Sequence, residues 1–358
     1  MYYLGLDVGS SSVKAAIVDA KSGKSILSVH EPKNEMGINS LNNDWAEQDP
    51  NMWWKYTCDA IKRVCKESNI DSKKISSVGI SYQMHGLVVV DKNGSPLRDS
   101  IIWCDSRAVN IGNEAFEKLG QEKCMCHLLN SPGNFTASKL KWVKDNEPNI
   151  YEKIYKYMLP GDFIAYKLTG EINTTRNGLS EGIIWDYKNN STADWLLDHY
   201  GIDSNLTPDL VDNFSNQGTT NLKSSNETGL NVGVPITYRA GDQPNNALAL
   251  NVFDNGEVAA SGGTSGVIYS ITNNLESNEP SRINHFAHVN YNNNHKSIGK
   301  LLCINGAGIQ YRWLRNHSTH ESYEKMNEVA ANIPVGSEGV SVIPFGNGSE
   351  RMLDNKNI

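Results

Sequence analysis

The chain has 358 residues, a length that suits one large domain or two of ordinary size. Hydrophobic residues make up 39% and charged residues 20%, which predicts a packed core rather than a disordered chain. The net charge is −7 and opposite charges are interspersed, so no basic surface for nucleic acid is expected. No apolar run has the length of a membrane span, the N-terminus does not resemble a signal peptide, and six scattered cysteines lack zinc-site spacing. We expect a cytoplasmic protein with reduced thiols.

The chain in order predicts an α/β protein. Apolar runs predict strands at residues 2–9, 12–19, 24–30 and 74–82 and a pair of strands within 85–105. Helical spacing of apolar residues predicts helices at 49–68, 110–120, 135–148 and 306–316 and on either side of Pro160 within 151–170. The polar section at 186–231 suits surface loops with one short helix at 193–200.

The last part of the chain contains two further units with polar turns. Residues 235–252 read as a strand that passes through Gly241 and Asp242 into a helix, and 256–272 read as a hairpin. The segment at 339–358 reads as a strand followed by a glycine loop. We expect the second hairpin to place glycine, serine and threonine at its tip.

Two hairpins far apart in the chain share one plan. "GLDVGSSSVKAAIVD" and "VAASGGTSGVIYSIT" both read strand, glycine with hydroxyl residues, strand. Any hairpin favours glycine at its turn, but the hydroxyl run in both indicates a duplicated α/β architecture with two phosphate-holding turns. Backbone N–H groups and hydroxyls donate to phosphate oxygens, and Lys14 adds a positive charge. Asp7, at the tip of the first hairpin, suits Mg²⁺ held through water; the alternative is a plain surface hairpin.

Polar residues also follow two of the predicted inner strands. "YQMHG" follows the strand at 74–82, and the carboxyl ends of strands are where α/β sheets bind ligands. "IIWCDSR" supplies an aromatic face beside polar groups, which suits a polyol. A structural histidine and an interior tryptophan beside a surface ion pair are the plainer interpretations. The candidate substrate residues from these segments are Gln83, Met84, His85, Trp103, Asp105 and Arg107.

Asp242 lies between a glycine and the start of a predicted helix. Aspartate is common there as a helix N-cap. The alternative is a general base that takes the proton of a sugar hydroxyl as that oxygen attacks a γ-phosphate.

From residue 1 to the last residue, the chain resembles the FGGY carbohydrate kinases and, within them, the xylulokinase group. "GLDVGSSSVKAAIVD" and "GGTSGV" are similar to the two phosphate motifs of that family, and "SKLKWVKDN" is similar to its signature, from which Asn134 departs. "QMHG" with "IIWCDSR" resembles the xylulokinase pattern, "AGDQPNNA" resembles the segment of the catalytic aspartate, and "PFGNGSER" resembles a later family loop.

The resemblance implies an actin-like, hexokinase-like (ribonuclease H-like) duplicated fold, with a first domain at 1–238, a partial second domain at 239–358 and a cleft between them. It implies phosphorylation of a ketose, foremost D-xylulose to D-xylulose 5-phosphate, with ATP and Mg²⁺ and with Asp242 as the catalytic base. It implies sugar contacts from Asn246 besides the residues above. The implied nucleotide ligands are Gly9, Ser10, Ser11, Ser12, Lys14, Gly263, Thr264, Ser265 and Gly306, with Asp7 for the metal.

Two departures from the family leave alternatives open. Gln243 and Pro244 stand between Asp242 and the asparagines that follow, so L-xylulose, ribulose or another ketose or polyol stays a candidate substrate. The family continues beyond the length of this chain, so we expect an incomplete second domain and keep a non-catalytic sugar sensor as the second hypothesis. An Hsp70-like ATPase of the same superfold would leave "QMHG" and "WCDSR" unexplained. Oligomeric state is open, with a homodimer as one option.

Overall fold

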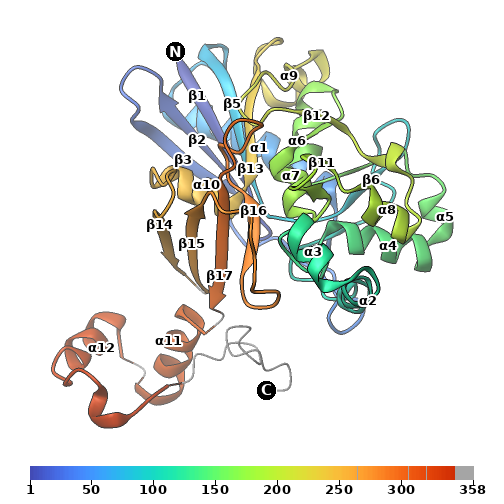
Figure 1. Cartoon of the computed structure of the whole chain (residues 1–358). Coiled ribbons are helices and arrows are strands. Elements are labelled where there is room, and N and C mark those ends of the chain that lie inside the picture. Colours follow the sequence, from blue (N-terminus) through green and yellow to red (C-terminus); the bar gives the residue numbers. More distant parts are fainter. Residues whose placement is uncertain (264, 305, 320, 343–358) are drawn as a thin grey trace.

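The computed structural model describes residues 1–263, 265–304, 306–319 and 321–342. Its first sheet has five strands in the order β13-β5-β1-β2-β3 (Figure 1). The strands are β1 (Tyr2–Val8), β2 (Val13–Asp19), β3 (Ser25–Glu31), β5 (Ile75–Tyr82) and β13 (Ile236–Gly241). β1 pairs antiparallel with β2, as the hairpin prediction requires, whereas β1, β5 and β13 run parallel.

Helices α1 (Pro50–Ser68) and α6 (Pro160–Thr169) cover one face of this sheet. α1 begins where the sequence predicts, because the side chain of Asp49 accepts a hydrogen bond from the N–H of Asn51 and Pro50 occupies the first turn. α6 also begins at a proline. In β1 the buried residues alternate, so Leu4, Leu6 and Val8 face the helices and Asp7 faces the other side.

The second sheet has four antiparallel strands in the order β14-β15-β17-β16. They are β14 (Val258–Gly262), β15 (Gly266–Thr272), β16 (Asn284–Ala287) and β17 (Ile298–Ile304). The hairpin β14–β15 is confirmed, and α10 (Asp242–Ala249) contacts both this hairpin and strands β5 and β13 of the first sheet (Figure 1). Ala247 of α10 belongs to a core that also holds Tyr269 and Phe286 of the second sheet.

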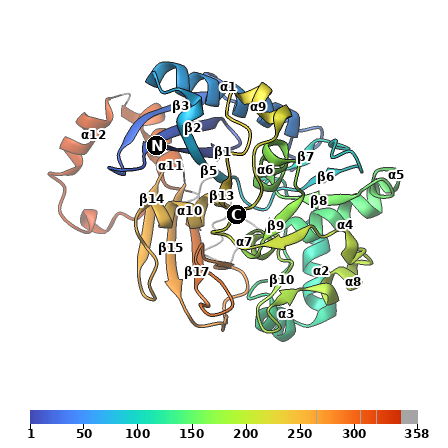
Figure 2. The ribbon, with the colours of Figure 1, turned by 90° about the horizontal axis from the view of Figure 1, so that it is seen from above.

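The middle of the chain forms a mainly helical region beside the two sheets. Its helices are α2 (Val109–Leu119), α3 (Gln121–His127), α4 (Thr136–Asn146), α5 (Pro148–Tyr151), α7 (Arg176–Glu181), α8 (Asp194–Tyr200) and α9 (Leu222–Thr228). Short strand pairs brace it: β4 (Glu47–Gln48) with β7 (Ser100–Ile101), β6 (Val88–Val90) with β8 (Lys156–Met158), β9 (Asn173–Thr175) with β12 (Asp209–Val211), and β10 (Trp185–Asp186) with β11 (Ser191–Thr192). α11 (Gly308–Leu314) and α12 (Tyr323–Ala330) lie on the opposite side (Figure 2).

The helices predicted at 49–68, 110–120, 135–148, 193–200 and 306–316 are confirmed as α1, α2, α4, α8 and α11. The helix predicted before Pro160 is wrong. Tyr155 N–H donates to the carbonyl of Val90, and β8 pairs with β6 there, so a partner strand from elsewhere in the chain overrides the local spacing. Leu159 is extended, as a residue before proline favours.

The polar section at 186–231 contains α9 as well as the one helix expected. Asn221 caps α9 by accepting a hydrogen bond from the N–H of Ser224, a signal that the composition of the segment conceals. Helices α3 and α7 and strands β16 and β17 were not predicted from the sequence. Of the segment at 339–358, residues 343–358 lie outside the described residues, and 340–342 are not in a strand. Within the described part, no helix is long and apolar enough to span a membrane.

Candidate active site

Three neighbouring parallel strands end together and bring the first candidates to one edge. β1 ends at Val8, β5 at Tyr82 and β13 at Gly241, and Tyr82 pairs with both of the others. The carboxyl ends of parallel strands share one edge of the sheet, where α/β folds bind ligands. Asp7, Gln83 and Asp242 therefore lie at the same edge, although they are far apart in the sequence.

Asp242 is the first residue of α10 and is partly exposed. The pKa of its carboxyl group is raised to about 6, first because surrounding protein excludes water from it and second because the carboxylate of Asp7 lies nearby. Hydrogen bonds from Gln243 and the charge of Lys14 act in the opposite direction. A carboxylate with a pKa near 6 is a stronger base than an ordinary aspartate and is still ionised at neutral pH.

Hydrogen bonds from other parts of the chain hold the backbone of the turn in the first hairpin. The N–H of Gly9 donates to the carbonyl of Ser12 at 3.1 Å, which closes the turn. Gln48 Nε2 donates to the carbonyl of Ser10 at 2.7 Å, and the N–H of Met36 donates to the carbonyl of Ser11 at 2.8 Å. Two carbonyl oxygens, which would repel a phosphate, are thereby held on the protein side of the turn.

Lys14 and Asp7 face each other across that hairpin. They are direct partners in the β1–β2 register, and Lys14 Nζ donates to Asp7 Oδ2 at 3.0 Å. Both side chains are accessible to solvent, so the pair is screened and adds little to stability. Both charges are therefore accessible to a phosphate and its counterion.

Gly263 and Ser265 lie at the end of the second hairpin. Gly262 pairs with Gly266, and the N–H of Gly263 donates to the carbonyl of Ser265 at 2.9 Å. The N–H of Gly308, at the start of α11, donates to the carbonyl of Gly263, and the buried Gly306 lies just before this helix. Thr264 lies outside the described residues.

The loop after β5 carries Met84 and His85. Gly241 leaves room for Met84, because a Cβ at that position would come within 2.6 Å of Met84 Cγ. His85 has a φ of 42°, in the left-handed region that costs energy for a residue with a side chain. Its ring meets that of Phe135 edge-to-face, with the centroids 4.9 Å apart. This loop therefore packs directly against the strand that leads into Asp242.

Trp103 is 50% exposed, an unusual fraction for so large an aromatic side chain. Its Nε1 donates to Ser10 Oγ at 3.4 Å, so the ring stands beside the first hairpin. Asn246 is exposed one helical turn after Asp242, which places the two side chains on one face of α10.

Asp105 and Arg107 contact each other and the segment that precedes α1. Asp105 is fully buried, accepts from the N–H of Ala46 at 2.6 Å and pairs with Arg107 through both oxygens. Arg107 also pairs with Glu47, and its guanidinium lies 3.8 Å from the centroid of the Trp45 ring. Their polar atoms hold the loop that carries Trp103.

The sequence of this chain matches a known family. Residues 2–249 match the model of the N-terminal domain of the FGGY family of carbohydrate kinases. The chain belongs to the FGGY family of carbohydrate kinases. It is 28% identical to a xylulose kinase of Staphylococcus xylosus over 96% of this chain and 70% of the relative, and 27% identical to one of Bacillus subtilis over 96% and 68%.

Solved structures agree on the fold of this FGGY kinase. A xylulose kinase from Rhodospirillum rubrum superposes with a TM-score of 0.88 at 22% identity, over 98% of this chain and 71% of that one. A glycerol kinase from Plasmodium falciparum with ADP superposes at 0.84 and 19% identity, over 98% and 74%. The fold is the actin-like, ribonuclease H-like fold of sugar kinases, as the sequence predicts, and the family uses ATP as its phosphoryl donor.

Two buried ionisable residues near the site were assigned no role from the sequence. Lys139 lies within the quoted "SKLKW" segment, and Glu181 ends α7 between small and apolar residues. Glu181 lies behind Gly241, whose Cβ position is 2.4 Å from Glu181 Oε2. Burial raises the pKa of Glu181 well above its usual value, and Tyr82 and Asp242 are among its neighbours. No local sequence signal marks either residue as buried, because the segments that cover them lie elsewhere in the chain.

The donors at the edge fit a hydrated cation better than a protein-enclosed one. Among the described residues, no group of three histidine, cysteine, aspartate or glutamate side chains could hold a metal ion. The accessible carboxylate of Asp7 suits Mg²⁺, which keeps several waters and takes its remaining ligands from phosphate oxygens.

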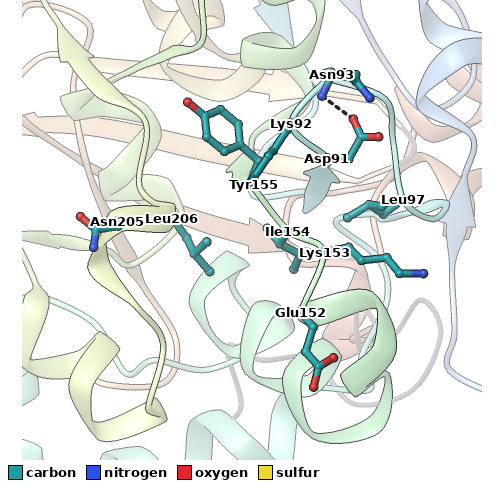
Figure 3. Close-up of a pocket in the computed structure, with 10 residues that line it drawn as sticks. All are labelled: Asp91, Lys92, Asn93, Leu97, Glu152, Lys153, Ile154, Tyr155, Asn205 and Leu206. Carbon is teal, nitrogen blue, oxygen red and sulfur yellow. Dashed lines mark hydrogen bonds between the residues drawn. The ribbon is translucent and has the colours of Figure 1, made fainter.

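A separate cavity of about 560 Å³ opens elsewhere on the surface (Figure 3). Asp91 and Asn93, at the turn after β6, line it together with Tyr155 and Leu206. None of the predicted site residues lines this cavity.

Proposed function

We propose that this FGGY kinase transfers the γ-phosphoryl group of ATP to a ketose, converting D-xylulose to D-xylulose 5-phosphate. The observation that carries the proposal is the position of Asp242. This carboxylate, with a raised pKa, lies where three parallel strands end, beside Asp7 and next to the loop of Met84 and His85. The names of its relatives support xylulose as the substrate.

In this proposal Asp242 orients the attacking sugar hydroxyl and takes its proton. The hydroxyl oxygen forms a bond to the γ-phosphorus while the bond from that phosphorus to the β,γ-bridging oxygen breaks, and ADP leaves with the electron pair. The pKa near 6 keeps Asp242 ionised before transfer and able to receive the proton as the new bond forms.

The two hairpins are assigned to the nucleotide. N–H groups and hydroxyls of the two turns would donate to the phosphate oxygens, Lys14, which pairs with Asp7 in this structure, would supply a positive charge to them, and Asp7 would hold Mg²⁺ through water. The proposed nucleotide ligands are Gly9, Ser10, Ser11, Ser12, Lys14, Gly263, Thr264, Ser265 and Gly306. Mg²⁺ would offset negative charge as the phosphoryl group moves.

The loops after β5 and β7 are assigned to the sugar. Gln83, Met84 and His85 contact it from one side and Trp103 offers its exposed face, which suits the C–H side of a polyol. Asn246 contributes from α10, while Asp105 and Arg107 shape the pocket by holding the loop of Trp103. We further propose domains at 1–238 and 239–358, action in the cytoplasm where ATP is supplied, and a homodimer as the assembly to test by light scattering.

The deciding experiment measures ADP release by the purified 358-residue chain. MgATP is supplied with D-xylulose, L-xylulose, ribulose and a small polyol set, and sugar binding is measured separately by calorimetry. Release that depends on D-xylulose supports the proposal. ADP release with another ketose but not with D-xylulose would show that the other ketose is the substrate. Sugar binding without ADP release would show a sugar sensor rather than a kinase.

A further inference from the structure

Lys139 is a lysine without an ion pair in the interior of the protein. It is 0% exposed on α4, and no carboxylate lies within ion-pair distance of it among the described residues. Burying a cation without a carboxylate partner is costly, so it persists only where other contacts compensate. Burial lowers the pKa of Lys139 to about 7, and the charge of Asp105 acts against that shift. Both its neutral and its charged form retain at least two N–H donors.

The N–H donors of Lys139 connect two separate loops. Lys139 Nζ donates to the carbonyl of His85 at 3.1 Å and to the carbonyl of Ile102 at 2.9 Å. His85 follows β5, whereas Ile102 follows β7 and immediately precedes Trp103. One amine therefore ties together the two segments that present candidate sugar contacts.

His85 is the residue whose conformation most needs such support. Its positive φ turns the carbonyl in a direction that an ordinary residue does not favour, and this carbonyl points to Lys139 Nζ. Nζ also lies 3.5 Å from His85 Nδ1, and Phe135, one turn before Lys139, packs its ring against the imidazole. The first turn of α4 thus contacts both the backbone and the ring of His85.

We propose that Lys139 is a positioning residue of the sugar site: it holds the His85 backbone and the Trp103 loop at a fixed separation. This rests on the proposed function, because it takes His85 and Trp103 as sugar contacts. Lys139 acts through these residues, and its link to the first hairpin is indirect, through the hydrogen bond from Trp103 Nε1 to Ser10 Oγ. Its removal should therefore affect the sugar more than the nucleotide.

The test compares Lys139→Met with Ser138→Ala on the same helix. Ser138 is equally buried and its hydroxyl contacts Tyr200 at 2.9 Å, away from His85. For Lys139→Met we expect the KM for D-xylulose to rise at least about tenfold while the KM for ATP stays within about twofold. Ser138→Ala should change neither constant. Lys139→Ala should regain sugar affinity with added n-propylamine, which a purely structural role would not produce.

A second measurement separates this inference from the proposed function. This measurement records the NMR signal of the His85 ring without sugar or nucleotide in the wild type, Lys139→Met and Ser138→Ala. The signal is assigned by its loss in His85→Gln. A signal that moves in Lys139→Met but not in Ser138→Ala supports the proposal that Lys139 positions His85. This conclusion holds even if the wild type phosphorylates no sugar, a result that would refute the proposed function alone. An unmoved signal, or equal rises in both KM values, overturns the role of Lys139; a Lys139→Met chain that does not fold is replaced by Lys139→Gln.

Discussion

The two glycine-tipped hairpins have the same sequence plan, yet different parts of the molecule hold their turns. The first turn is fastened by Gln48 and by the backbone of Met36, and its strand β2 packs against α1. The second turn is fastened through Gly308 of α11, and the outer strand β14 is mostly exposed. A local pattern therefore predicts that a turn exists, while distant residues decide how rigidly it is held.

The largest expected effect is the loss of kcat when Asp242 is substituted. Asp242→Asn keeps the shape of the side chain and removes the base, so kcat should fall on the order of 10²–10⁴ with little change in sugar affinity. Turnover near the wild-type value would contradict the role of Asp242.

Thermal unfolding of Asp242→Asn shows whether its lower kcat results from a less stable fold. The folded-state pKa of Asp242 lies above the ordinary 3.8, so its contribution to stability is present at low pH and is lost as the pH rises through about 6. At pH 8 the Asn variant should therefore unfold at the same temperature as the wild type or a higher one.

The next effect tests what fastens the first turn. Gln48 is buried, donates to the carbonyls of Ser10 and Gly37, and accepts from the indole N–H of Trp53 at 3.0 Å. Gln48→Leu leaves these buried groups without partners, so the free energy of unfolding should fall by about 1–3 kcal/mol. The KM for ATP should rise with it, because the turn of the first hairpin loses a contact. An unchanged KM for ATP would show that the turn does not need this support.

Local patterns predicted the position in the fold of the candidate residues whose surroundings lie on one element. The run from β13 into α10 placed Asp242 at a strand end, and both hairpins were visible from glycine and hydroxyl residues between apolar runs. Residues whose partners lie far along the chain could not be placed this way. Asp105 in "WCDSR" accepts from the N–H of Ala46, 59 positions earlier, and forms a buried ion pair with Arg107, and the local sequence does not show the distant partner.

Partners far along the chain also explain why the helix predicted before Pro160 is wrong and why the burial of Lys139 was not predicted. The segment before Pro160 has helical spacing, and only the presence of β6 turns it into strand β8. Lys139 looks like one more surface lysine in "SKLKWVKDN", because nothing local shows that the loops of His85 and Ile102 cover it. Periodicity reports which face of an element is buried, but not which segment buries it.

A pair of alanine substitutions separates the two turns by a smaller effect. A Cβ at Gly9 would lie 3.2 Å from the carbonyl oxygen of Ser12, whereas at Gly263 the nearest atom, Ser265 O, is 3.8 Å away. Gly9→Ala should lower the free energy of unfolding by about 1 kcal/mol, and Gly263→Ala should lower it less. Both should raise the KM for ATP, since a methyl group obstructs the approach of phosphate to the backbone. Equal stability losses would show that the two turns are equally constrained.

The smallest expected effect is a shift in pH dependence that links the first hairpin to Asp242. The ionised form of Asp242 accepts the proton, so kcat/KM should fall as the pH drops through about 6. Asp7 raises the pKa of Asp242 by its negative charge, so Asp7→Asn should move this acidic limb to lower pH. Gly263→Ala, in the other hairpin, carries no charge change and should leave the limb in place while it weakens ATP binding. The position of the limb is read from the shape of the profile, so it can be measured even though Asp7→Asn also lowers activity by weakening the metal site. A limb that stays at its wild-type position in Asp7→Asn, or that moves equally in both variants, would mean that the charge of Asp7 does not act on Asp242, and the proposed link between the first hairpin and the base would be wrong.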